Sequence, residues 1–469
     1  MLVRDESLSL RHPERWTLAV PCFIPRSGEG WKGRSLTDEH LNRFVSAVVG
    51  LFCSTGHRHV LLASDGRRES REIASQLGAY LDEVGAHTSR ILPPVTAPLL
   101  SHAVRVSGAR CGIYVTASHR PNDWVGLKVK GAHGGAISDA TCAEIERRMA
   151  FEQAGKRLRG TTTELDRHAV LSSYVAELGQ RLDSIPRCER RLRVLYPECC
   201  PAMDLFDIAK ILDIAVHATF VEMATDADLD VISVLHAFEE RGRYSPEFTV
   251  ALDPDADSVG VHQPQMVELS THLSFLLIAE QQRQAQNNVC AVAELGMLPG
   301  LEEILAPWGG AVTYADARFV GLSGLARSNQ ATMCGDENGN IGVRAINHRR
   351  DGLAAAIMAY SVSQELPEVV TKLKRRRADR YVRLDLAANT DAKADAVMRQ
   401  LEQVLNWRRT SVEAQADTVI LRADDSRWLL VRRSTTTPSF RIRGEVNDNS
   451  RTRLQSFVAL QTSKDLVMR

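Results

Sequence analysis

The stretches HVLLA (residues 59–63), TSRIL (88–92) and CGIYV (111–115) each have the length and character of a short buried strand. Helical spacing of apolar residues fills the segments before and between them, which are 41–52, 69–84 and 94–106. Thr37, followed by two acidic residues, is a suitable N-terminal cap for the first of these helices. Strands that alternate with helices in this way predict a parallel, doubly wound α/β sheet.

The same alternation continues more weakly along the chain. Further strands are expected at 192–195, 248–252 and 289–292, with helices at 202–212, at 269–284 and near Leu301. The tail is different, because it predicts strands at 380–386, 418–422 and 428–431 around one helix at 392–405. The charged run KLKRRR, residues 372–377, is a candidate linker or a solvated helix end. We therefore expect domains at 1–160, 161–265, 266–372 and 373–469.

The composition excludes several classes of protein. Acidic and basic residues number 58 each, so no overall field would recruit nucleic acid or an anionic membrane. Nine scattered cysteines without a C-x-x-C pair favour neither a disulfide framework nor a zinc site. The charged N-terminus lacks a signal-peptide pattern, and no segment has the length of an apolar membrane span. We expect a cytoplasmic protein without nucleic-acid or membrane partners.

The segment TASHRP, residues 116–121, directly follows the predicted strand CGIYV. Adjacent Ser118 and His119 are compatible with nucleophilic chemistry, and a polar turn closed by Pro121 is the alternative. The G-x-S-x-G elbow of serine hydrolases is absent, because no glycines flank Ser118. Ligands gather at the carboxyl ends of strands in open α/β sheets, so the position of this segment favours function.

Three aspartates alternate in DPDAD, directly after the predicted strand at 248–252. The spacing of two lets Asp253, Asp255 and Asp257 converge, and three neighbouring carboxylates are costly without a cation. An EF-hand is excluded, because Ser258 stands where that loop needs glycine and the twelfth position is a proline. We predict a Mg²⁺ site here, with a solvated acidic loop as the alternative.

Two further segments gain weight only beside the first two. RRSTTTP, which begins at Arg432, offers a guanidinium, hydroxyls and backbone N–H groups suited to phosphate, although it could equally be a polar hairpin turn. GDENGN, which begins at Gly335, offers donors and acceptors suited to sugar hydroxyls, although such clusters commonly form simple turns.

Together and in this order, the four segments resemble the motifs of the α-D-phosphohexomutases, which include phosphomannomutase, phosphoglucomutase and phosphoglucosamine mutase. TASHRP is similar to that family's T-A-S-H-N-P phosphoserine loop, and DPDAD to its metal loop. GDENGN stands where the family has its G-E-x-S-G-H sugar loop, and RRSTTTPSFRIR resembles its phosphate loop, R-x-S-x-T-x-P. The resemblance spans essentially the whole chain. It implies three doubly wound α/β domains of related topology and a C-terminal α+β domain, arranged around a central cleft.

The resemblance also implies an activity, that of a phosphosugar mutase. Such an isomerase moves a phosphoryl group between positions 1 and 6 (or 5) of a sugar phosphate through a bisphosphorylated intermediate. Ser118 would carry the phosphoryl group, His119 would support its loop and Lys128 would transfer protons. Mg²⁺ would be held by Ser118, Asp253, Asp255 and Asp257, and a sugar bisphosphate would act as activator. The expected sugar contacts are Asp336, Glu337, Asn338 and Asn340. The expected phosphate contacts are Arg432, Ser434, Thr435, Thr436 and Thr437.

The chain departs from the family pattern close to the expected chemistry. Ser258 follows the aspartates where the family has arginine, so a cation beside the transferring phosphate is expected to be missing. Asn340 replaces histidine in the sugar loop, Asp336 and Asn338 replace glutamate and serine, and Gly30 stands where arginine is usual. An active mutase with an altered substrate is the first hypothesis. The alternative is a sugar-phosphate-binding regulatory or scaffold protein, or one that only transfers or hydrolyses phosphoryl groups. Either would act on a small sugar phosphate as a monomer or homodimer.

Overall fold

The computed structural model describes most of the chain. The described residues are 2–4, 16–18, 36–53, 57–122, 124–151, 159–181, 191–224, 227–242, 246–286, 288–297, 301–315, 318–375, 381–387, 394–406, 409–415, 418–423, 427–433 and 439–467. Four larger sheets and a small antiparallel pair, β1 (Leu2–Arg4) with β2 (Trp16–Leu18), make up its strands. Within these residues, no helix is both long enough and apolar enough to cross a membrane.

The first sheet has five strands in the order β6-β5-β3-β4-β7, all parallel to their neighbours except β6. Its strands are β3 (His59–Ser64), β4 (His87–Ile91), β5 (Cys111–Val115), β6 (Leu127–Gly131) and β7 (Thr161–Leu165). Its helices are α1 (Asp38–Phe52), α2 (Arg68–Glu83), α3 (Ala97–Ser107) and α4 (Asp139–Phe151). Successive residues of β3 pack into different apolar clusters, Val60 with α1 and Leu61 with α3, so helices cover both faces. The predicted cap is confirmed, since Thr37 accepts a hydrogen bond from His40 N.

The second and third sheets have four strands each, in the orders β11-β10-β8-β9 and β15-β14-β12-β13. Their strands are β8 (Leu192–Tyr196), β9 (Val216–Phe220), β10 (Phe248–Leu252), β11 (Val259–Val261), β12 (Cys290–Glu294), β13 (Ala311–Ala315), β14 (Met333–Gly335) and β15 (Ile341–Val343). Helices α5 (Arg167–Arg181), α6 (Met203–Ile211) and α7 (Val231–Glu240) accompany the second sheet. The third has α8 (Ser270–Gln286), α9 (Leu301–Leu305), α10 (Phe319–Ser328), α11 (Gly352–Ser361) and α12 (Leu366–Arg375), with short 3-10 turns η1 (Val267–Leu269), η2 (Ala306–Trp308), η3 (Arg344–Ile346) and η4 (Ser363–Glu365).

These three sheets share one topology. In each, a parallel strand leads into a loop and a short antiparallel strand returns at the sheet edge, namely β5 to β6, β10 to β11 and β14 to β15. The segments TASHRP, DPDAD and GDENGN occupy the three loops. Every residue of α11 is buried, because this apolar helix lies in the core that the units share. The loops are therefore equivalent places in three related units.

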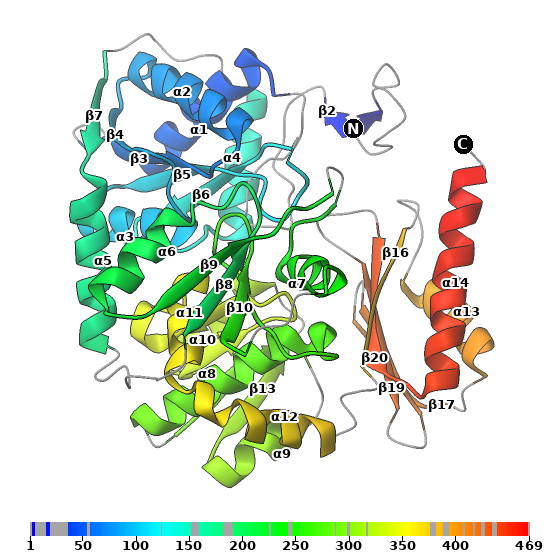
Figure 1. The fold of residues 1–469 in the computed structure, drawn as a ribbon. Coiled ribbons are helices and arrows are strands. Elements are labelled where there is room, and N and C mark those ends of the chain that lie inside the picture. The colour runs from blue at the N-terminus through cyan, green and yellow to red at the C-terminus, as the bar shows by residue number, and fades with distance from the viewer. Residues whose placement is uncertain are drawn as a thin grey trace.

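The fourth sheet is antiparallel throughout, in the order β16-β20-β19-β18-β17. Its strands are β16 (Tyr381–Ala387), β17 (Arg409–Gln415), β18 (Thr418–Ala423), β19 (Trp428–Arg433) and β20 (Ser439–Glu445), and its helices are α13 (Ala394–Leu405) and α14 (Asp448–Val467). Figure 1 shows α13 and α14 on the side of this sheet that faces away from the rest of the molecule. The opposite face therefore points toward the other three units.

The predicted fold class, α/β units followed by an α+β module, is confirmed by this architecture. Of the two alternatives for the charged run 372–377, the helix end is the one observed, because residues 372–375 close helix α12, while the next two lie outside the described residues. The predicted boundaries stay predictions: those at 265 and 372 fall between the strands of successive sheets, whereas the one at 160 precedes β7, which is still a strand of the first sheet.

Candidate active site

Ser118 lies in the loop after β5, with 3% of its surface exposed. Its backbone φ of 54° is a left-handed conformation that non-glycine residues rarely adopt. Arg67 holds this loop in place, since its guanidinium donates hydrogen bonds to the carbonyl oxygens of Ser118 (2.6 Å), Arg120 (2.9 Å) and Pro121 (2.5 Å). The strained serine is therefore fixed by a buried arginine that the first sheet supplies.

His119 contributes at least its backbone to the same loop. Its carbonyl oxygen accepts a hydrogen bond from Leu229 N at 2.5 Å, which ties the serine loop to the second unit. Arg120 makes a second tie, because its Nη1 lies 3.3 Å from a carboxylate oxygen of Asp228 and its guanidinium lies over the Trp124 ring. The serine loop is thus anchored to the second unit through the two residues that follow Ser118.

Lys128 connects the serine to the aspartates. It lies on β6, opposite Tyr114 of β5, and its side chain is almost completely buried. Its Nζ lies 3.3 Å from Ser118 Oγ, 2.6 Å from Asp255 Oδ2 and 3.1 Å from Asp257 Oδ2. One ammonium therefore bridges two groups that are far apart in the sequence, as the hypothesis of a shared site requires.

The aspartates occupy the loop between β10 and β11. Asp253, Asp255 and Asp257 are all buried, and each offers an oxygen within 4.8 Å of the others. The loop curls around Asp253, whose Oδ1 accepts hydrogen bonds from the backbone N–H groups of Asp257 and Ser258, both at 3.0 Å. The alternating spacing in the sequence therefore gives the predicted convergence.

The electrostatics of this cluster suit a cation. Burial raises the pKa of Asp253 well above its usual range, and the carboxylates of Asp255 and Asp257 raise it further. Asp255 Oδ1 is buried and has no hydrogen-bond partner among the described residues. An unpartnered carboxylate oxygen in a set of oxygen donors fits Mg²⁺, which binds such ligands in preference to nitrogen or sulfur.

The loops of all three units meet at the aspartates. Asp255 O accepts a hydrogen bond from Ala97 N of the first unit at 3.0 Å, and Ala256 O accepts one from Gly352 N of the third, also at 3.0 Å. The third unit's sugar-loop segment makes a further contact, because Val259 N donates to Gly339 O at 3.0 Å. These backbone hydrogen bonds explain how segments from separate sheets keep one geometry.

Within the segment GDENGN, two predicted residues interact directly. Asn340 Nδ2 donates to Asp336 Oδ2 at 2.8 Å, and both side chains are largely buried. Burial, reinforced by the nearby Glu294 carboxylate, raises the pKa of Asp336 to about 7. Asn338 is half-buried, and its side-chain oxygen lies 3.4 Å from Arg383 Nη2. These three remain candidates for sugar contacts.

Glu337 and Arg432 lie together, although the sequence analysis assigned them to different ligand groups. Glu337 is completely buried, and its carboxylate accepts hydrogen bonds from Arg443 Nε at 2.6 Å and from Arg432 Nη2 at 3.4 Å. Arg432 also forms an ion pair with Glu294. Ser434, Thr435, Thr436 and Thr437 lie outside the described residues. In this structure the two predicted contacts therefore bind each other.

Comparison with known proteins shows which enzymes the chain is similar to. Residues 27–156 match the family model described as phosphoglucomutase/phosphomannomutase, alpha/beta/alpha domain I. The phosphoglucosamine mutase of Trichormus variabilis is 24% identical over 412 residues, which are 82% of this chain and 78% of that protein. A crystal structure of a phosphoglucomutase/phosphomannomutase family protein from Burkholderia thailandensis superposes with a TM-score of 0.72 at 18% identity, covering 92% of this chain and 95% of that one.

The N-terminal unit therefore matches domain I of the phosphoglucomutase/phosphomannomutase family, and the fold of the chain is similar to that of a solved protein of this family. Some alignments cover much less than the whole of a relative: the match to the phosphoglucomutase of Staphylococcus haemolyticus, 27% identical over 226 residues, spans 43% of this chain and 40% of that protein. In the present chain, the serine loop, Lys128 and the aspartate loop come together as the family motifs imply. The departures from those motifs are confined to a few named positions.

One departure from the family pattern is compensated in space. Because Ser258 replaces the family arginine, we expected a cation to be missing beside the transferring phosphate, and this stays a prediction; beside the aspartates, however, a guanidinium arrives from another unit. Arg350, from the turn before α11, places Nη1 3.7 Å from Asp257 Oδ2. Sequence reasoning missed Arg350, since nothing in its local pattern marks it as a neighbour of the aspartate loop.

The departure at Ser258 also lies beside a second one, at Asn340. Ser258 and Asn340 form an isolated β-bridge, and Ser258 Oγ donates a hydrogen bond to Asn340 Oδ1 at 3.0 Å. The residues that stand in place of the family arginine and histidine therefore contact each other and join the aspartate loop to the sugar loop. Relative to the family pattern, this chain has a rearranged polar network at the same place.

Proposed function

We propose that the chain is a phosphosugar mutase that works through phosphorylated Ser118. The observation that carries this proposal is the position of Lys128, whose ammonium contacts Ser118 Oγ and two of the clustered aspartates. A solvated acidic loop would have no reason to bury three carboxylates against a lysine and a strained serine. The family relationship supports the same activity, and the sugar is proposed only as a hexose or pentose phosphate.

Asp253, Asp255 and Asp257 would hold Mg²⁺ together with the serine-bound phosphate. When bound, the ion neutralises negative charge on the phosphoryl group and lowers the repulsion that an incoming oxygen meets. A sugar bisphosphate would load the serine initially and serve as activator.

In the first half-reaction, a sugar hydroxyl releases its proton to solvent and forms a new P–O bond while the bond between phosphorus and Ser118 Oγ breaks. Lys128 would give a proton to the departing serine oxygen, which its Nζ approaches at 3.3 Å. In the second half-reaction, Ser118 Oγ returns that proton to Lys128 and attacks the other phosphate of the bisphosphate. The sugar oxygen takes up a proton from solvent as it leaves, which balances the proton released in the first half-reaction, so serine and lysine end each cycle as they began.

Intact-mass measurement tests the serine's role. After incubation with Mg²⁺ and glucose 1,6-bisphosphate, we expect the purified protein to gain the mass of one phosphoryl group. Ser118→Ala should abolish this gain, whereas Ser172→Ala, which alters an exposed serine on α5, should retain it. Absence of the adduct with any hexose or pentose bisphosphate would reject the mutase and favour a sugar-phosphate-binding protein.

A second measurement tests the aspartates. Asp255→Asn keeps the shape of the side chain and removes one negative charge from the cluster, so we expect turnover of sugar phosphates and its dependence on Mg²⁺ both to be lost. Asp213→Asn, outside this cluster, should leave both unchanged. An Asp255→Asn protein with unaltered rate and metal dependence would remove Asp255 from the site.

A further inference from the structure

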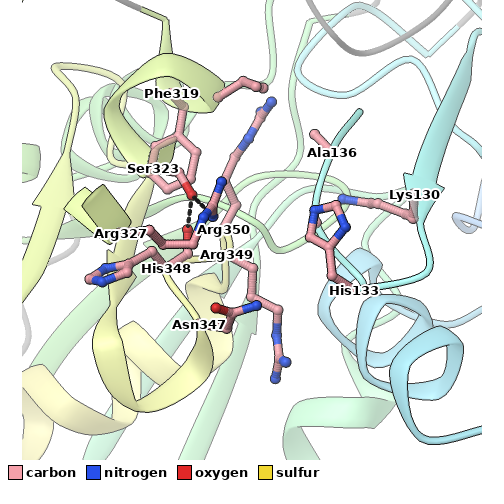
Figure 2. Close-up of a pocket in the computed structure, with 12 residues that line it drawn as sticks. Lys130, His133, Ala136, Phe319, Ser323, Arg327, Asn347, His348, Arg349 and Arg350 are labelled. Atoms are coloured by element: carbon pink, nitrogen blue, oxygen red, sulfur yellow. Dashed lines mark hydrogen bonds between the residues drawn. The ribbon is translucent and has the colours of Figure 1, made fainter. Parts of the chain in front are cut away.

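A cationic pocket lies next to the Ser118 site, between the first and third units. Lys130 and His133 line one wall, and residues from α10 and from the turn before α11 line the other (Figure 2). Cavities of about 20 Å³ and about 240 Å³ adjoin here and share Arg327, Asn347 and His348. None of the described lining residues is acidic. The pocket thus collects positive charge at the surface of the molecule.

Lys130 is one of the buried cations of this pocket. Its exposed fraction is 5%, and its ammonium donates no hydrogen bond to any residue that the structure describes. Burial lowers the pKa of Lys130 to about 8, and the Asp257 carboxylate only partly offsets this effect. A buried charged group without hydrogen-bond partners is costly, so Lys130 indicates that an anionic partner belongs beside it.

Arg349 is a second buried cation with unsatisfied hydrogen-bond donors. It is 4% exposed, and its Nε and Nη1 atoms are buried without hydrogen-bond partners in the described part of the chain. Its Nη2 lies 3.4 Å from Glu177, and its Nε lies 4.0 Å from Asp351, so part of its charge is balanced from behind. The unpartnered N–H groups of Arg349 are donors that an oxyanion could accept hydrogen bonds from.

The outer part of the pocket is also cationic. Arg327 is exposed on α10, donates to Ser323 Oγ at 2.6 Å and makes no ion pair with the described residues. Buried and exposed cations in one pocket resemble the arrangement that proteins use for phosphate and other oxyanions. The narrow cavity has room for a water-sized group, and the wider one can take the rest of a larger ligand.

We propose that this pocket, built around Lys130, Arg327 and Arg349, binds a phosphate-type oxyanion. Its location relates it to the site of Ser118. Lys128 and Lys130 are two residues apart on β6 and so point to the same face, and Arg350 both lines the pocket and approaches Asp257. The oxyanion can therefore be the second phosphate of the sugar substrate, which rests on the proposed function, or a free inorganic ion. In contrast, the C-terminal Arg432 already pairs with Glu294 and Glu337.

Calorimetric titration tests this pocket without requiring turnover. Inorganic phosphate is titrated into Ser118→Ala protein with Mg²⁺, and then into the same protein carrying Lys130→Met or Arg327→Gln. We expect each pocket substitution to raise the Kd for phosphate at least tenfold. Lys210→Met on α6 and Arg68→Gln on α2 remove the same charges from exposed positions and should leave the Kd unchanged. Arg327 is exposed, so its substitution does not threaten folding.

The source of the anion is read from a parallel titration with glucose 6-phosphate. If the pocket substitutions weaken this ligand by a similar factor and inorganic phosphate competes with it, the site holds the substrate's phosphate. If only inorganic phosphate is affected, the site holds a free ion. Equal phosphate affinity in all variants, or no binding to the parent protein, overturns the proposal. Ser118 phosphorylation, measured by mass, reports separately on the proposed function.

Discussion

Arg67 shows how one buried side chain can set the geometry of a reacting residue. Its planar guanidinium holds three carbonyl oxygens of the serine loop, and Asp65 orients it through Oδ2 at 3.1 Å from Nε. We regard Arg67 as a positioning residue, because it contacts the backbone of Ser118 and not its hydroxyl. The D-G-R turn that carries it resembles a structural turn of the family, and its contact with the serine loop could not be seen from the sequence.

Arg67→Lys should therefore slow the chemistry more than it weakens ligand binding. An ammonium cannot hold three carbonyls in one plane, and a displacement of about 1 Å at a reacting group can cost about 100-fold in rate. We expect kcat, and the rate of Ser118 phosphorylation, to fall about 100-fold while KM changes little. Arg71→Lys, on the exposed side of α2, is the matched control. A folded Arg67→Lys protein with unchanged kcat would contradict this role.

Helix α11 supports the aspartate loop through its first residue. Gly352 N donates to Ala256 O, and a Cβ at this position would lie 2.7 Å from the carbonyl oxygens of both Ala256 and Ser258. We expect Gly352→Ala to destabilise the protein by about 1–3 kcal/mol, since neither backbone oxygen can move without disturbing the loop. Chemical denaturation measures this. Gly179→Ala in α5 meets no atom within 4 Å and should be neutral or stabilising. If the two substitutions changed the free energy of unfolding equally, the close approach of Gly352 to the aspartate loop would not limit the size of the residue at this position.

The elements differ in how far the sequence could predict them. Strands such as 248–252 and helices such as 69–84 were predicted, because they are long apolar runs or have clear helical periodicity. The return strand β6 was missed, since LKVKG alternates lysines with apolar residues and gives no sign that both lysines are buried. β11 and β15 were also missed, because three residues are too few to show a pattern.

The candidate site, too, could be predicted from the sequence only in part. The serine and aspartate loops could be predicted from local sequence and resemblance, since each motif is continuous in the chain. The contacts of Arg350 with Asp257 and of Glu337 with Arg443 could not, because they join separate units and leave no spacing to recognise.

The C-terminal sheet is joined to the third unit by a concentration of charge. Arg383 and Arg443 are cross-strand partners, as are Arg432 and Arg441, so four guanidinium groups share one face of the sheet. Like charges opposite one another are unfavourable unless a counter-charge intervenes, and buried Glu337 provides it. Because Glu337 belongs to the sugar loop, this ion cluster couples the position of the whole C-terminal sheet to that loop.

Glu337→Gln should therefore loosen the molecule at this junction. Among the described residues, the substitution leaves the completely buried Arg443 with the Asp385 carboxylate alone, and breaking such a buried pair costs about 3 kcal/mol. We expect a lower denaturant midpoint than in the parent protein. Glu72→Gln, which breaks the exposed pair with Arg68, should change the midpoint little.

The same cluster predicts a dependence of stability on acid. Burial alone would raise the pKa of Glu337, but Arg443, Arg432, Arg441 and Arg383 outweigh it and hold the pKa well below the usual 4.5. A folded-state pKa below the unfolded one contributes stability above about pH 4.5, and this contribution is lost as the pH falls through the folded value. The parent protein should therefore lose more free energy of unfolding below pH 4.5 than Glu337→Gln does. Glutamine has no proton to take up. If the free energy of unfolding fell by the same amount with pH in both proteins, the cluster would be rejected as a source of acid-dependent stability.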